Sequence, residues 1–143
     1  MNIQDYKGVF VFAQQVDNVL SGIALELVGK GKDLAKDLNT EVTAVLVGSD
    51  VKGLADELAE YGADKVIVVD DPELKEYRTE PYAHALSSVI NEFKPEIFLV
   101  GATAIGRDLG PRVSARIHTC HTGEVPRGRC RYLPTPSRWL RGL

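Results

Sequence analysis

The sequence predicts an α/β protein built on an open, doubly wound parallel sheet. Three observations predict this class: short apolar runs alternate with amphipathic helical patterns, the runs are continuously apolar, and the segments between them are long enough for helical crossovers. Continuous apolar strands are typical of a parallel sheet covered on both faces. Strict alternation of strands and helices gives the order β-α-β-α-β-α-β-α. The length of 143 residues fits one domain.

Four runs are predicted to be strands. Each is rich in β-branched or aromatic residues and is bounded by charged or turn-forming residues. They cover residues 8–13, 41–47, 65–69 and 96–100.

The first two helices are indicated by apolar residues at spacings of three and four. The first pattern covers residues 24–38, with lysines on its other face, and the second covers residues 54–61. Gly62 follows the second pattern and is predicted to be a left-handed C-cap.

Prolines delimit the other two helices. The third pattern covers residues 82–93, behind Pro81 and ended by Pro95. The fourth is expected to start near Asp108 or Gly110 with Pro111 in its first turn, and to continue to Ile117.

Charge and hydropathy exclude two classes of partner. Residues 1–118 hold 12 basic and 19 acidic residues, so the body of the chain offers nucleic acid no electrostatic footprint. No apolar stretch is long enough to span a membrane, and residues 1–5 have neither the basic nor the apolar part of a signal peptide. We therefore expect no membrane insertion and a cytoplasmic location.

In doubly wound sheets ligands bind beyond the carboxyl ends of the strands. The segment after residues 8–13 contains neither a G-x-G-x-x-G fingerprint nor a Walker A loop. Residues 14–18 can hydrogen-bond a ligand or partner, but a solvated turn is favoured. Asp70 and Asp71 follow the third strand; without acids after the first strand they are interpreted as opening a turn.

The loop after the fourth strand, residues 101–112, is the most informative segment. Its glycines allow close backbone approach, and two arginines near a helix start suit an anion or a carboxylate-bearing partner. The alternative, equally weighted on the motif alone, is a tight strand-to-helix turn in which Arg107 pairs with Asp108, or Asp108 caps the helix. The candidate interface or anion-contacting residues are Gly101, Gly106, Arg107, Asp108, Gly110 and Arg112.

No catalytic set can be assembled from the chain. His84 is interpreted as a structural or exposed residue, and no set of nucleophile, base and orienting group is recognised. The spacing of His118, Cys120, His121 and Cys130 matches no familiar zinc pattern, so no metal site is predicted.

Several segments carry a resemblance to a known family, above all Gly-Ala-Thr-Ala-Ile-Gly-Arg-Asp-Leu-Gly-Pro-Arg-Val at residues 101–113. The others are residues 6–13, 25–31, 61–66 and 94–97. Over about residues 1–119 the chain resembles the N-terminal domain of electron-transfer flavoprotein alpha subunits.

The resemblance implies a Rossmann-like fold of the adenine nucleotide alpha-hydrolase-like type. In this family the alpha subunit pairs with a beta subunit and carries electrons through FAD from acyl-CoA dehydrogenase-type partners. The FAD is held mainly by a C-terminal domain that this chain lacks. The chain is therefore expected to be a fragment of an electron carrier rather than an enzyme, serving as scaffold and subunit interface without a cofactor of its own. Similar subunits of anaerobic bacteria include some that bifurcate electrons with a second FAD and NADH.

The resemblance stops after Thr119, where the family would continue Gly-Leu-Thr-Ala-Asp into another strand. Residues 120–143 instead contain five arginines and one acid. We expect a family domain at residues 1–119 and a non-family basic tail at residues 120–143, out of frame or disordered; a genuine basic arm is the alternative. Without a further strand the truncated sheet would have an unpaired edge.

A different class of function is a stand-alone adenine-nucleotide-binding protein of the universal-stress type. Such proteins bind ATP with a G-x-x-G motif followed by a distant G-[ST] pair. Gly101, Gly106 and Gly110 do not supply that spacing. This alternative is therefore less favoured than the flavoprotein fragment.

Overall fold

The sheet is assembled mainly from the apolar runs predicted to be strands, and all of its pairings are parallel. A computed structural model describes residues 5–122 and 138–142. In these residues the main sheet has the order β5-β4-β1-β6-β8-β7. Its strands are β1 (Val9–Ala13), β4 (Val42–Gly48), β5 (Lys65–Asp70), β6 (Ile97–Gly101), β7 (Cys120–Thr122) and β8 (Arg138–Gly142).

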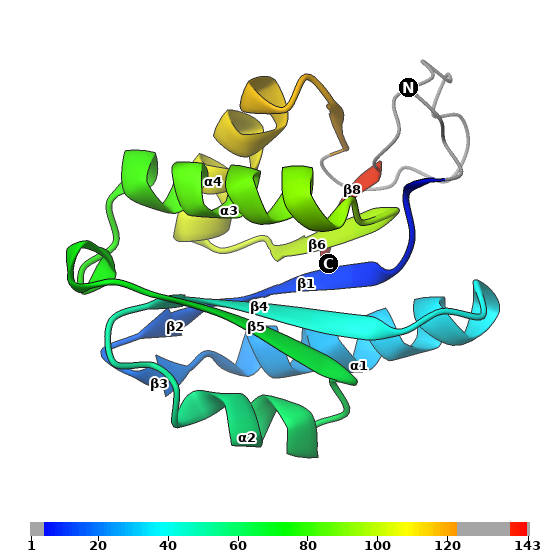
Figure 1. Cartoon of the computed structure of the whole chain (residues 1–143), viewed down its shortest axis with the longest axis horizontal. Helices are drawn as coiled ribbons and strands as arrows, with labels where there is room; N and C mark the ends of the chain where they lie inside the picture. Colours follow the sequence, from blue (N-terminus) through cyan, green and yellow to red (C-terminus); the bar gives the residue numbers. More distant parts are fainter. Residues whose placement is uncertain (1–4, 123–137, 143) are drawn as a thin grey trace.

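Helices cover both faces of the sheet (Figure 1). On one face lie α1 (Gly22–Asp37) and α2 (Leu54–Glu60), and on the other lie α3 (Thr79–Phe93) and α4 (Ala104–Arg116). A short 3-10 helix, η2 (Pro72–Leu74), connects β5 with α3. The predicted doubly wound α/β class is confirmed.

Each face of the sheet has its own apolar core, because successive side chains of a strand point to opposite faces. Val9, Val11 and Ala13 of β1 pack with α1 and α2. Phe10 and Phe12, which alternate with them, pack against α3 and α4. All five residues are buried, which explains why the run is apolar without interruption.

The four predicted strands and first three predicted helices are confirmed, with small shifts at their ends. Gly62 has φ of 115°, in the left-handed region expected of a residue that ends a helix. Asp71 opens the η2 turn as expected, since its carboxylate accepts a hydrogen bond from the amide of Glu73.

The predicted start of the fourth helix was wrong. α4 begins at Ala104, because the hydroxyl of Thr103 accepts a hydrogen bond from the amide of Gly106 and caps the helix. Pro111 therefore lies inside α4 rather than in its first turn. It has no amide hydrogen for the carbonyl of Arg107, four residues earlier.

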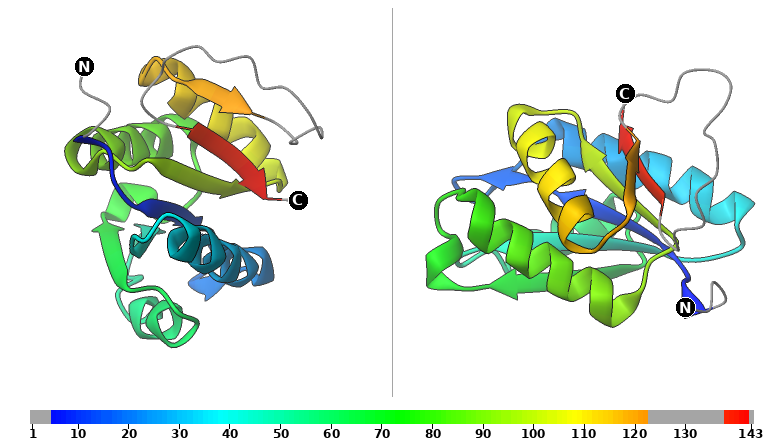
Figure 2. Two further views of the ribbon diagram at one scale, coloured as in Figure 1. Left: turned by 90° about the vertical axis from the view of Figure 1, so that its right-hand side faces the viewer. Right: turned by 90° about the horizontal axis from the view of Figure 1, so that it is seen from above.

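The expectation of an unpaired edge beside the fourth strand was also wrong. β8 pairs in parallel with β6, from Ile97 opposite Arg138 to Gly101 opposite Gly142, and β7 pairs with the other side of β8. Figure 2 shows both strands beyond β6. Most of the predicted basic tail, residues 123–137 and 143, lies outside the described residues. Its assignment as a non-family tail stays a prediction.

A small hairpin between β1 and α1 was not predicted. Its strands are β2 (Gln15–Val16) and β3 (Val19–Leu20), which pair antiparallel. Asp17 and Asn18 between them have φ of 51° and 59°. These positive angles at both central residues are typical of a type I′ turn, in which Asn and Asp are tolerated.

Candidate functional site

The strand order reverses between β1 and β6, so their carboxyl ends form the switch point of the sheet. α1 leaves from the β1 side to one face, and α4 leaves from β6 to the other. In open α/β sheets the crevice at this point is the usual ligand site. In this chain the β2–β3 hairpin and the first turn of α4 follow the two strands at this point.

A direct side-chain bond spans this switch point. The hydroxyl of Thr103 donates a 2.6 Å hydrogen bond to Oε1 of Gln14, which directly follows β1. The same hydroxyl caps α4, so both of its hydrogen-bonding functions are used. Gln14 is buried, and its backbone carbonyl accepts a hydrogen bond from the backbone amide of Ser21, the N-cap residue of α1. The starts of both helices are thus tied to one buried glutamine.

The neighbouring Gln15 fastens the hairpin to the sheet. Its Nε2 donates to the carbonyl of Val47 at the end of β4, and its Oε1 accepts from the amide of Asn18 in the turn. Gly48 makes room for this side chain, since a Cβ there would lie 2.6 Å from Nε2 of Gln15. The interpretation of residues 14–18 as a solvated turn was therefore only partly right: the two glutamines are buried, whereas residues 16–18 are exposed.

Gly106 allows α4 to approach the end of β6. A Cβ at this position would lie 1.8 Å from the backbone carbonyl oxygen of Gly101, far inside contact distance. Gly101, Gly106 and Gly110 are all buried. Gly101 and Gly106 lie in the packing between β6 and its neighbouring helices, which agrees with the predicted close approach of backbone.

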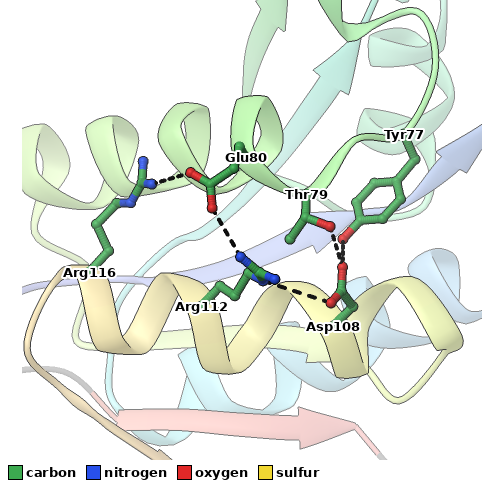
Figure 3. A network of polar contacts seen from close by, with 6 residues as sticks. All are labelled: Tyr77, Thr79, Glu80, Asp108, Arg112 and Arg116. Atoms are coloured by element: carbon green, nitrogen blue, oxygen red, sulfur yellow. Dashed lines mark hydrogen bonds and ion pairs between the residues drawn. The ribbon is translucent and has the colours of Figure 1, made fainter.

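Asp108 and Arg112 do not point freely into solvent; both lie in a polar network between α4 and the start of α3 (Figure 3). The carboxylate of Asp108 accepts hydrogen bonds from the hydroxyls of Tyr77 (2.8 Å) and Thr79 (2.5 Å). Nε of Arg112 lies 3.9 Å from Oδ1 of Asp108. The proposed roles of Asp108 as helix cap and as partner of Arg107 are therefore wrong.

Glu80 is the second carboxylate of this network. Its Oε1 accepts a hydrogen bond from Nη1 of Arg112 at 3.1 Å, and its Oε2 accepts one from Nη2 of Arg116 at 2.6 Å. Glu80 therefore joins the first turn of α3 to the last turns of α4. The three side chains are 38 to 63% exposed. At such exposure each ion pair contributes little to stability, but the pairs connect two neighbouring helices that run in the same direction (Figure 3).

The surroundings shift the acidity of two groups in the network. Burial, together with the hydrogen bond to the carboxylate of Asp108 and the charge of that group, raises the pKa of Tyr77 to about 12, although the contact with Thr79 acts in the opposite direction. The hydroxyls of Thr79 and Tyr77 hold the pKa of Asp108 below its usual value, because both donate to its ionised form. Asp108 is thus a stable acceptor at neutral pH rather than a proton-transferring group.

Arg107 is the predicted site residue that stays available. It is exposed in the first turns of α4 and, within residues 5–122 and 138–142, its side chain forms no hydrogen bond or ion pair. A cation at this place can meet an anion or a carboxylate-bearing partner. The roles of Arg107 and of the surrounding loop residues in an interface stay a prediction.

Metal ligands do not converge in the described part of the chain, where no group of three or more His, Cys, Asp or Glu side chains could hold an ion. His84 is exposed on α3, and His118 is exposed in the turn after α4. Cys130 lies outside the described residues. Within the described residues, no helix is both long and apolar enough to cross a membrane.

Sequence reasoning missed Gln14, Thr103, Tyr77, Thr79 and Glu80 as organising residues. The Gln14–Thr103 bond joins positions 89 residues apart, so only the pairing of β1 with β6 brings them together. One signal was available: Thr103 stands three residues before Gly106, at the spacing of an N-cap and the amide that it caps.

The family model and closely similar curated proteins point to the same family. Residues 9–125 match the model of the electron transfer flavoprotein domain. Protein FixB of Clostridium saccharobutylicum is 51% identical over 124 residues, and the electron transfer flavoprotein subunit alpha of Clostridium acetobutylicum is 48% identical over 124 residues. In both cases the match covers 87% of this chain but 37% of the relative. The chain thus spans little more than a third of the length of these curated relatives.

Two further proteins place this match in context. The lactate dehydrogenase (NAD(+),ferredoxin) subunit LctC of Acetobacterium woodii is 43% identical over 119 residues, covering 83% of this chain and 28% of that protein. Among solved structures, a universal stress protein in complex with cAMP has a TM-score of 0.53 at 19% identity, covering 80% of this chain and 92% of that chain. At this identity the second likeness shows the fold alone, and the universal-stress function is not favoured.

Proposed function

The chain belongs to the electron transfer flavoprotein domain family, and on that basis we propose that it is the N-terminal part of an alpha subunit that acts as scaffold and subunit interface. The observation that carries the proposal is the family match over residues 9–125, supported by relatives close to 50% identical. In the parent subunit, a further domain holds the FAD, and a beta subunit completes the electron carrier. The chain has no catalysis or cofactor of its own in this proposal.

The closed switch point supports a scaffolding role. The Gln14–Thr103 bond and the buried Gln15 occupy the ends of β1 and β4 where a doubly wound sheet would otherwise admit a nucleotide. The exposed surface there is offered by the hairpin, where Val16 is 52% and Val19 67% exposed. We assign these two valines and the exposed Arg107 to the contact with the beta subunit.

A chimera tests the proposal. Residues 9–119 of this chain replace the matching segment of the Clostridium acetobutylicum alpha subunit, which is then produced with its beta subunit. We expect a co-purifying complex with a flavin absorption spectrum. A well-folded chimera that fails to bind the beta subunit would contradict the interface role. Flavin bound by the 143-residue chain alone would contradict its assignment as cofactor-free.

The parent complex is proposed to take electrons from acyl-CoA dehydrogenase-type partners in the cytoplasm. NADH is a second proposed donor, because LctC is named for a lactate dehydrogenase that uses NAD(+) and ferredoxin. Anaerobic addition of NADH to the assembled chimera tests this point. Bleaching of the flavin spectrum is expected, and an unchanged spectrum would rule out NADH as donor for that complex.

The boundary at Thr119 is also retained as a proposal, with residues 120–143 as a non-family tail. The abrupt change to five arginines and one acid supports it. Resequencing of the coding DNA tests it: a frameshift near codon 119 is expected, and an intact frame to Leu143 would refute the out-of-frame origin.

A further inference from the structure

An open groove follows the exposed side of α3 next to the end of β5, at a distance from the switch point. Its volume is about 680 Å³, and its floor includes Val69 of β5, Leu74 of η2, and Ala85 and Val89 of α3. We call it the α3 groove. β5 is an edge strand of the main sheet, so nothing in the described residues continues the sheet beyond it (Figure 1).

Carboxylates surround the apolar floor. Asp71, Glu73, Glu80 and Glu92 line the groove and are exposed, whereas Arg116 is its single arginine or lysine. Arg116 is already paired with Glu80. In the described part of the chain, Glu73 and Glu92 form no ion pair, so the rim keeps a negative charge.

The combination of apolar floor and acidic rim selects one kind of partner. Nucleic acids and anionic lipid surfaces are repelled by the rim. A small ligand would stay largely in solvent, because most of the rim side chains are exposed, whereas ligand sites usually enclose their occupant. A polypeptide that presents apolar side chains flanked by lysines or arginines complements both features.

The length of the groove indicates a helical partner. Its lining extends along α3 from Glu80 to Glu92, which at 1.5 Å per residue corresponds to about 18 Å, or roughly three helical turns. A helix of this length places apolar residues at i, i+3 or i+4, and i+7 on one face. We propose that the α3 groove binds a basic amphipathic helix of a partner protein. The inference is independent of the proposed contact with the beta subunit, which uses the hairpin and Arg107.

The test uses the 143-residue chain and a designed peptide of four helical turns, with leucines along one face and lysines elsewhere. A second peptide, with glutamates in place of the lysines, is the control probe. Fluorescence anisotropy should show binding of the lysine peptide that weakens with salt, and no comparable binding of the glutamate peptide. Equal binding of both peptides, or binding insensitive to salt, would overturn the proposal.

Matched charge variants locate the site. Glu73→Gln with Glu92→Gln removes two carboxylates from the rim, and Asp33→Asn with Asp37→Asn removes two exposed carboxylates from α1. The first pair should weaken peptide binding roughly three- to tenfold and the second less than about twofold, as expected for exposed charge pairs. Equal losses would show attraction to net charge alone and would overturn the groove assignment.

Two further measurements separate the outcomes. Ser88→Lys adds a cation at an exposed position of the groove on a helix that tolerates it, and should weaken binding while circular dichroism stays unchanged. Amide chemical shifts in the labelled chain should change along α3 and at Val69. Shift changes confined to the hairpin, or stronger binding to anionic vesicles than to the lysine peptide, would contradict the proposal.

Discussion

The hydroxyl of Thr103 and the amide oxygen of Gln14 are 2.6 Å apart and join the ends of β1 and β6 across the point where the strand order reverses. The bond is formed by a residue that also caps α4. Two structural tasks therefore depend on one hydroxyl group. This arrangement leads to the first of four predictions.

Thr103→Val removes the cap and the bridge but keeps the size of the side chain. The free energy of unfolding should fall by about 2 kcal/mol, the sum expected for a lost N-cap and a partly buried hydrogen bond. Urea unfolding followed by circular dichroism measures it. Thr103→Ser keeps the hydroxyl and serves as control. Equal stability of the two variants would contradict the double role.

Gly106→Ala tests the close approach of α4 to β6. The added Cβ would meet the Gly101 carbonyl oxygen at 1.8 Å, so backbone must shift, and we expect at least about 2 kcal/mol of destabilisation. Gly29→Ala in α1 is the matched control, since nothing lies within 4 Å of its Cβ. That control should be stabilised by up to about 1 kcal/mol, as for glycine in a helix interior. Thermal unfolding that moves both variants in the same direction would count against the packing explanation.

Glu80→Gln breaks both ion pairs that connect α3 with α4. Because the side chains are largely exposed, the loss in stability should be about 1 kcal/mol or less, and high salt should abolish it. Glu26→Gln, on the exposed side of α1, is the control for the change in net charge. Urea midpoints at low and high salt measure the effect. A loss that persists at high salt would show that packing, rather than charge, is involved.

Asp108→Asn should change how stability depends on pH. The pKa of Asp108 is depressed in the folded chain, so the unfolded chain takes up its proton first as pH falls. The contribution of this carboxylate is present above about pH 4, the ordinary value of an aspartate, and is lost as pH falls through the folded pKa. The variant should lose this part of the acid dependence. Urea midpoints between neutral and acidic pH measure it, and an unchanged acid slope would refute the assignment.

The sheet was predictable because burial on both faces leaves little choice of residue. Phe10 and Val11 lie in different cores, yet both must be apolar, and this gives the continuous runs seen in all four predicted strands. Helix starts were less predictable, because a proline fits a first turn and, at the cost of one hydrogen bond, an interior position as well. Pro111 occupies an interior position because Thr103 caps α4 and so starts the helix at Ala104, well before the proline.

The sequence identified residues 101–112 as a candidate site, but it did not indicate which residues their side chains contact. Nothing near Asp108 in the sequence indicates that its partners are Tyr77 and Thr79, about 30 residues earlier. The hairpin at Gln15–Leu20 has strands of only two residues each, too short to produce a period. β8 was missed for a different reason, since its run of Arg, Trp, Leu and Arg has only two apolar residues between two charged ones and so does not resemble the buried strands.

Pro111 has a mechanical consequence for α4. The turn before it is anchored to the sheet at Gly106, and the turns after it are anchored to α3 through Arg112 and Arg116. The hydrogen bond that the proline lacks would have joined these two parts. α4 can therefore bend at Pro111. A tilt of α3 can then be accommodated by bending of α4, without displacing the end of β6.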